Sequence, residues 1–129
     1  MTEEIKKNLK TEIDKYKQVQ KDYHKALSQR QQLDGQLNEN VAVKKELDLL
    51  KPDDNVFKLI GPVLIKQDLE EAKENVAKRM GYISSELKRV EDLIVTLDKK
   101  QESHQEMLEK YQQMFYQAQV KASASQPKT

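Results

Sequence analysis

Residues 56–66 read VFKLIGPVLIK and lie near the middle of a chain of 129 residues. Two short runs rich in β-branched and large apolar side chains flank the dipeptide Gly61-Pro62, a pattern typical of a β-hairpin. Gly61 can take the positive φ of the first turn position, and Pro62 fits the negative φ of the second, as a type II′ turn requires. The stretch therefore predicts one β-hairpin over about residues 55–67.

This hairpin is expected to be apolar on both faces. Side chains along a strand point alternately to opposite faces, but here the apolar residues do not alternate with polar ones. A lone pair of strands is only marginally stable in water, and its edges offer unpaired backbone groups. One interpretation is that the hairpin folds back on its own helices. We favour the other, in which it joins hairpins of other subunits in an intersubunit β-barrel. The residues expected to mediate this oligomerisation are Val56, Phe57, Leu59, Ile60, Val63, Leu64 and Ile65.

Long segments almost free of helix-breaking residues precede and follow the hairpin. The first has one glycine before Pro52 ends it, which predicts a helix over about residues 3–50. Asp68 is a candidate N-cap, with Glu71 three residues later as in a capping box. A second helix is expected over about residues 69–118, followed by a disordered tail over about 119–129, where small and polar residues dominate.

The second helix carries apolar positions spaced alternately four and three residues apart. A repeat of 3.5 residues is the mark of a left-handed coiled coil, because a single amphipathic helix would drift out of this register. The stripe then faces a partner helix continuously and forms a seam. Its members are Val76, Met80, Ile83, Leu87, Val90, Ile94, Leu97, Gln101, His104, Leu108, Tyr111, Phe115 and Ala118.

The first helix has a similar stripe with more polar interruptions. The two stripes mirror each other about residue 60, so that Leu9 falls opposite Tyr111 and Tyr16 opposite His104. We therefore expect a mostly α fold in which two long antiparallel helices, joined by the hairpin, form a single domain over residues 1–129. The stripe consists of Leu9, Glu12, Tyr16, Val19, Tyr23, Ala26, Arg30, Leu33, Leu37, Asn40, Lys44 and Leu47.

Composition narrows the function classes. Charged residues make up 35% of the chain and there is no Trp, too polar for a compact globule but suited to helices that bury a narrow seam. The 23 basic and 22 acidic residues are interspersed, so no electrostatic footprint for nucleic acid or for a membrane surface is expected. The first residues lack the apolar run of a secretory signal, and no apolar stretch approaches the ~20 residues of a membrane span. We expect a soluble, cytoplasmic protein.

No pattern in the sequence predicts an enzyme. There is no cysteine, no glycine-rich phosphate loop and no nucleophile motif. The two histidines, His24 and His104, fall about eight residues apart along the paired helices and lack metal-ligand spacing. We therefore expect no catalytic residue, no cofactor and no metal site.

Residues 56–67, VFKLIGPVLIKQ, closely resemble the hairpin segment of β-class prefoldin subunits. The segments NVAVKKEL at 40–47 and RMGYI at 79–83 are also similar to that class, and the resemblance covers about residues 3–118. It implies a heterohexamer of two α-class and four β-class subunits, whose hairpins form a double β-barrel that carries six coiled coils. Such complexes capture unfolded proteins, actin and tubulin among them, without ATP and deliver them to the cytosolic chaperonin.

Large apolar side chains gather at the free ends of the two helices, and we name them the tip cluster. Aromatic and Met side chains offer adaptable contact area for varied apolar segments, so we expect client binding here. Completing the seam explains Tyr111 and Phe115 equally well, whereas Met107, Met114 and Tyr116 lie off the main stripe. The tip cluster comprises Ile5, Leu9, Met107, Tyr111, Met114, Phe115 and Tyr116.

Two other functions stay open on the sequence alone. The chain could be a structural or adaptor coiled coil that joins a fixed partner without holding unfolded proteins. A factor associated with nucleic acid is a more remote alternative, which the balanced charge disfavours.

Overall fold

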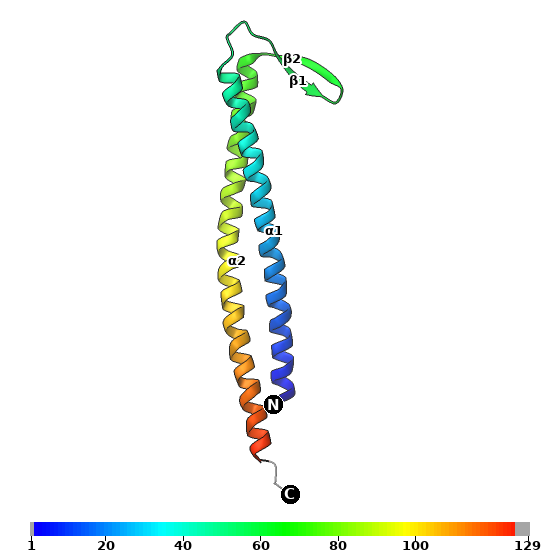
Figure 1. Cartoon of the computed structure of the whole chain (residues 1–129), viewed down its shortest axis with the longest axis vertical. Coiled ribbons are helices and arrows are strands. Elements are labelled where there is room, and N and C mark those ends of the chain that lie inside the picture. Colours follow the sequence, from blue (N-terminus) through cyan, green and yellow to red (C-terminus); the bar gives the residue numbers. More distant parts are fainter. Residues whose placement is uncertain (1, 126–129) are drawn as a thin grey trace. The chain divides into compact units, whose positions relative to one another are not determined.

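The computed structural model describes residues 2–125 and contains two long helices joined by a two-stranded hairpin (Figure 1). The element order is α1 (Thr2–Asp48), β1 (Val56–Ile60), β2 (Val63–Gln67) and α2 (Leu69–Ser125). The chain divides into two units: unit 1 takes in Met1–Leu27 and Asp92–Thr129, and unit 2 is Ser28–Glu91. The expected fold class, mostly helical with one antiparallel hairpin, is confirmed.

Unit 2 contains the hairpin and the adjoining halves of both helices, which run antiparallel (Figure 1). Its core starts beneath the hairpin, where Leu47 of α1 is buried against Leu69 and Ala72 of α2. Leu50, Val56 and Val76 pack against this cluster and are partly buried. Farther along α2 the buried residues are Ile83, Leu87 and Val90, the last with no exposed surface.

Unit 1 pairs the first part of α1 with the last part of α2. Ile5 and Ala26 of α1 and Leu97 of α2 are buried, together with one charged side chain, Glu12. Most other seam positions of this unit are half-buried. Its core therefore contains fewer fully buried apolar side chains than the core of unit 2.

Burial along α2 follows the 3.5-residue repeat. Each position that the repeat assigns to the seam, from Val76 to Ala118, is buried or half-buried, while most of the positions between them are exposed. In α1 the assigned positions are also buried or half-buried, except for Arg30 and Lys44. The periodicity thus identified the packed stripe of both helices.

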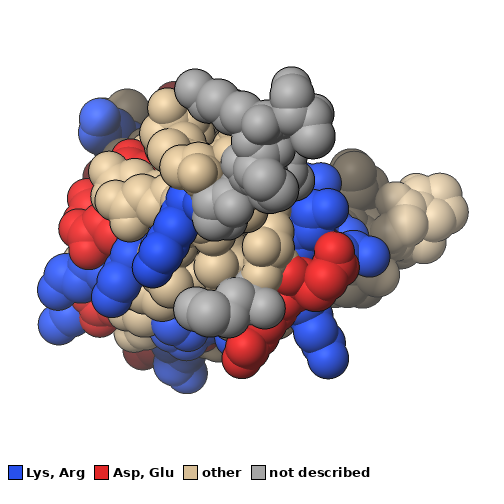
Figure 2. All heavy atoms as spheres, turned by 90° about the horizontal axis from the view of Figure 1, so that it is seen from below, with Lys and Arg blue, Asp and Glu red and all other residues tan. Residues whose placement is uncertain are grey.

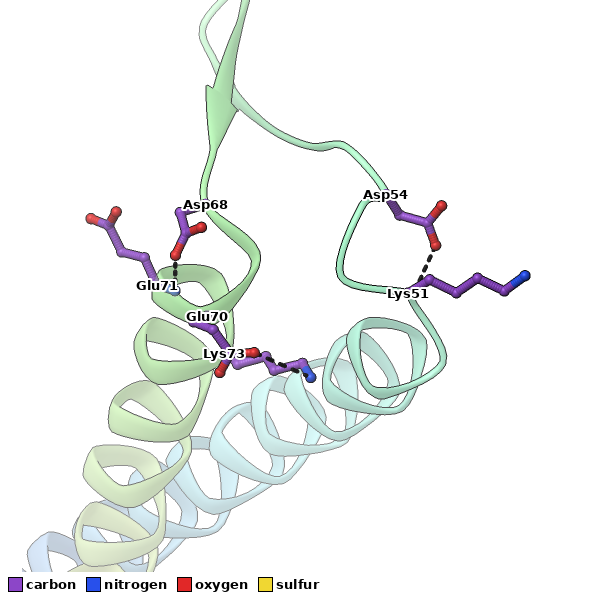
Figure 3. A network of polar contacts seen from close by, with 6 residues as sticks. All are labelled: Lys51, Asp54, Asp68, Glu70, Glu71 and Lys73. Atoms are coloured by element: carbon purple, nitrogen blue, oxygen red, sulfur yellow. Dashed lines mark hydrogen bonds and ion pairs between the residues drawn. The ribbon is translucent and has the colours of Figure 1, made fainter.

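The turn and the start of α2 have the local geometry expected from the sequence. Gly61 has a φ of 57°, and Ile60 pairs with Val63 across a two-residue turn. Asp68 caps α2 by accepting a hydrogen bond from the Glu71 backbone N–H at 3.2 Å (Figure 3). In the loop before β1, the Lys51 backbone N–H donates to the Asp54 carboxylate at 2.7 Å (Figure 3).

The helix ends differ from those expected. α1 ends at Asp48, where the Leu50 N–H donates to the Leu47 carbonyl at 3.2 Å and tightens the final turn. α2 continues to Ser125, so residues 119–125 are helical where a disordered tail was expected. These residues include Gln, Lys and three Ala or Val side chains but no helix breaker, and the first proline beyond them is Pro127. The remainder of the expected tail, residues 126–129, lies outside the described residues.

Replacing Leu87 with Ala should lower the free energy of unfolding by about 2–5 kcal/mol, because it leaves a cavity in the seam. Leu49 provides a matched control, since its side chain is 78% exposed against 8% for Leu87. Leu49→Ala should change the free energy by no more than about 0.5 kcal/mol. Urea unfolding followed by circular dichroism measures both values, and equal losses would contradict the assigned seam.

Replacing Asp68 with Ala should destabilise the chain by about 1 kcal/mol, because the first turn of α2 loses its side-chain acceptor. Asp68→Asn keeps an acceptor oxygen at the same place and should stay close to the original stability. The same unfolding measurement compares the two variants. Equal stability of the Ala and Asn variants would show that the cap contributes nothing.

Candidate assembly hairpin and helix tip

The strand register distributes apolar side chains over both faces of the hairpin. Leu59 lies opposite Leu64, and Ile60 lies opposite Val63. Because residues facing each other across an antiparallel pair share a face, Phe57, Leu59 and Leu64 lie on one face. The opposite face carries Val56, Ile60, Val63 and Ile65. The expectation of two apolar faces is therefore met.

Most of this apolar surface is exposed in the isolated chain. Leu59 and Leu64 are 68% and 65% exposed, and Phe57, Ile60, Val63 and Ile65 are exposed by about half. Val56 alone among the seven packs on the helices, against the buried cluster beneath the hairpin. The hairpin is attached at its base, and its own helices leave both faces uncovered.

A groove lies between the base of the hairpin and the ends of the two helices in unit 2. Its volume is about 320 Å³, and its walls are mainly apolar. Phe57 and Leu59 contribute to its lining from the hairpin. The remaining lining residues are Val43, Leu47, Val56, Lys58, Gln67, Ala72, Asn75, Val76 and Arg79.

The tip cluster splits into buried, half-buried and exposed members. Ile5 is buried, whereas Met114 and Tyr116 are 41% and 67% exposed. The other four, Leu9, Met107, Tyr111 and Phe115, are half-buried. Met107 lies off the main stripe, as Met114 and Tyr116 do, but it directly precedes the seam residue Leu108. It therefore flanks the seam and is partly covered.

An open groove of about 490 Å³ brings Ile5 and Met114 together in unit 1. Lys6 places its ammonium 6.0 Å from the centre of the Phe115 ring, close enough for a cation–π contact. Tyr116 lines separate hollows with Gln112, Gln113 and Gln119 rather than this groove. Besides Ile5 and Met114, the groove is lined by Thr2, Gln117, Ala118, Lys121 and Ala122.

A polar contact within the seam of unit 1 was not anticipated. His104 Nδ1 and Glu12 Oε1 are 2.5 Å apart, and both side chains are largely buried. Because the two stripes mirror each other about residue 60, Tyr16 was expected opposite His104. The hydrogen-bond partner of His104 is instead Glu12, one helical turn earlier. The sequence did contain a signal for this contact, since each helix has a polar residue at a seam position and a buried carboxylate needs a partner.

The outer helix faces carry charges of both signs. Arg30 lies 3.7 Å from Glu91 across unit 2, with both side chains about half exposed. Glu86 raises the pKa of Arg89, first by a hydrogen bond and then by charge attraction, and the pair is 3.0 Å apart. Basic and acidic side chains are also interspersed on the face shown in Figure 2. Such exposed pairs contribute little to stability.

The described part of the chain lacks two further features. Residues 2–125 contain no group of three or more His, Cys, Asp or Glu side chains that could hold a metal ion. No helix in that range is both long enough and apolar enough to cross a membrane.

The family model described as "Prefoldin subunit" matches residues 3–115, which is most of the chain. The chain belongs to the prefoldin subunit family. Prefoldin subunit 6 of Canis lupus familiaris is 49% identical over 126 residues, which cover 97% of this chain and 98% of the relative. Prefoldin subunit 6 of Homo sapiens is 48% identical over 127 residues, covering 98% of both proteins.

A solved structure has the same fold. The crystal structure of the prefoldin beta subunit from Thermococcus strain KS-1 superposes with a TM-score of 0.70 and covers 93% of this chain and 95% of that one. At 17% sequence identity this likeness supports the fold alone. The resemblance to the prefoldin family, stated from the hairpin segment, is confirmed by the family model and by the relatives. Membership of this family implies assembly with other prefoldin subunits.

Proposed function

We propose that this chain is a subunit of a heterohexameric, ATP-independent chaperone of the cytoplasm. Two α-class and three further β-class prefoldin subunits would complete the complex. The complex captures unfolded proteins of the actin and tubulin class and delivers them to the cytosolic chaperonin. The chain itself acts by binding, without catalysis and without a cofactor. The observation that carries this proposal is the exposed hairpin, apolar on both faces.

Assembly follows from the surface that the hairpin leaves open. Six of its seven large apolar side chains are exposed by about half or more, and a monomeric soluble protein rarely leaves such a patch in water. Each strand also has one unpaired edge, because the sheet contains only β1 and β2. Hairpins of neighbouring subunits would satisfy those edges and cover both faces at once.

Client capture rests on the tip cluster of unit 1. Met114 and Tyr116 offer exposed apolar surface, and Met adapts its shape to different partners. The groove beside Met114 is open and mostly apolar in its lining, so it can accept a side chain of an unfolded segment. One such contact is weak, but several subunits tethered in one complex raise the effective concentration of the remaining tips.

Replacing Leu59 and Leu64 together with Ser should abolish assembly while the helical circular dichroism of the chain stays unchanged. The two side chains face each other on one exposed hairpin face, so their loss removes contact area without opening the helix seam. Native mass spectrometry after mixing with α-class and other β-class prefoldin subunits measures assembly. Lys58→Ser, also on the hairpin, is the control and should assemble normally. A full-size complex from the double variant would contradict the role of this face.

Replacing Met114 and Tyr116 with Ser should leave assembly intact and weaken suppression of aggregation of denatured actin. Losing apolar contact worth about 1–2 kcal/mol weakens each tip by about 5–30-fold. The matched control replaces Tyr82 and Leu93 with Ser, since they are 69% and 37% exposed but lie outside the tip cluster. Light scattering of the assembled complexes compares the two.

The results of that comparison separate the proposed function from its alternative. Equal suppression by the tip variant and the control would contradict client binding at the tip cluster. A complex that assembles but suppresses no aggregation, even with the unchanged chain, would indicate an adaptor coiled coil instead of a chaperone.

A further inference from the structure

The contact between Glu12 and His104 joins the two helices of unit 1 within the seam. The imidazole N–H donates to the carboxylate, whose side chain is 10% exposed, while the His104 side chain is 24% exposed. Among the residues that the structure describes, Glu12 is the one charged side chain in the buried class. Both residues occupy positions where the repeat would otherwise place apolar side chains.

A buried pair of this kind contributes more to alignment than to stability. An apolar pair of similar volume would bury equally well in several alignments, whereas a buried carboxylate is tolerated only beside its partner. If α1 moved by one heptad relative to α2, Glu12 would lie opposite Leu97 or Tyr111 in place of His104. His104 would then lie opposite Ile5 or Val19. Each misaligned arrangement leaves a polar group buried without its partner.

The groove of the tip cluster depends on that alignment. Thr2 and Ile5 line it from α1, while Met114 and Ala118 line it from α2. The wall contributed by α1 starts two turns from Glu12, so a shift at the pair carries directly to the groove. We propose that Glu12 and His104 are positioning residues, which hold the two helices of unit 1 in the alignment that builds the groove. The role of the groove in client binding rests on the proposed function, whereas the alignment of the two helices does not.

Distance measurements between spin labels can test the alignment directly in the full chain. The protein contains no cysteine, so Lys21→Cys and Gln119→Cys allow two labels to be attached without background. Both positions are exposed and belong to unit 1, one on each helix. Because α-helices rise ~1.5 Å per residue, a shift of one heptad changes the separation along the axis by about 10 Å. Pulsed electron–electron double resonance resolves a change of this size in the distance between the two labels.

Two double variants are compared with the original pair. Glu12→His with His104→Glu exchanges the partners and should preserve a single distance matching that of the original chain. Glu12→Leu with His104→Leu should keep or raise the melting temperature but broaden the distribution or add a distance about 10 Å away. The single variant His104→Leu should melt at a lower temperature than both, because it leaves the carboxylate without its partner.

A third variant tests whether any cross-helix charge pair would behave in this way. Replacing Arg30 and Glu91 with Gln removes the half-exposed pair of unit 2 and should leave the distance distribution unchanged. The proposal is overturned if the Leu–Leu variant keeps the single original distance, or if the exchanged pair melts as low as His104→Leu. Should the Leu–Leu variant fail to fold, the comparison of the exchanged pair with His104→Leu still decides the outcome.

The consequence for clients is measured separately. In the assembled complex, the Leu–Leu variant should suppress aggregation of denatured actin less well than the exchanged pair. Equal suppression with altered distances would overturn the link between alignment and the groove. If the complex with the unchanged chain does not suppress actin aggregation, that result counts against the proposed function alone, since the distance measurement requires no client.

Discussion

The narrowness of the apolar stripe on each helix constrains the rest of this structure. With 35% of its residues charged, the chain has too few apolar side chains to enclose a broad core. A seam between two helices buries one stripe from each and leaves the other faces in water. Because hydrophobic burial scales with area, the helices must be long to gather enough of it. The stability of the helix pair therefore comes from the length of the helices, since they have no broad core.

A seam of this kind has no further apolar surface with which to cover the segment that joins the helices. The hairpin must reverse the chain, and its Gly-Pro turn does so with the positive φ of Gly61. Its strands are nevertheless far more apolar than a solvated turn requires, and the helix ends cover only its base, at Val56. The same limitation that makes the helices long thus leaves the hairpin available to other chains. Membership of the prefoldin family, which implies assembly with other subunits, agrees with an exposed hairpin.

The repeat in the helices and the turn residues of the hairpin were enough to predict the helix seam and the hairpin from the sequence. The 3.5-residue repeat identified the buried stripe of α2, and Gly61-Pro62 identified the turn, since both depend on local spacing. The helical continuation to Ser125 was missed because small polar residues suggested a tail, although Ala, Gln and Lys also favour helix. The contact between Glu12 and His104 was missed for a different reason. A mirror rule fixes the pairing only to within one turn, and the exact partner depends on packing along the whole seam.

The two ends of the seam differ in the chemistry of their buried residues. Near the hairpin the core is formed by Leu, Ile, Val and Ala side chains, as at Ile83 and Val90. In unit 1 it includes a carboxylate and an imidazole among half-buried side chains. An apolar seam holds helices together strongly but discriminates poorly between alignments, while a polar pair does the reverse. Placing the polar pair in the unit that contains the open groove gives that unit a defined alignment with a weaker seam. Such a combination would suit the client binding proposed for the tip cluster, because the groove keeps its shape and can still adapt to partners of varied form.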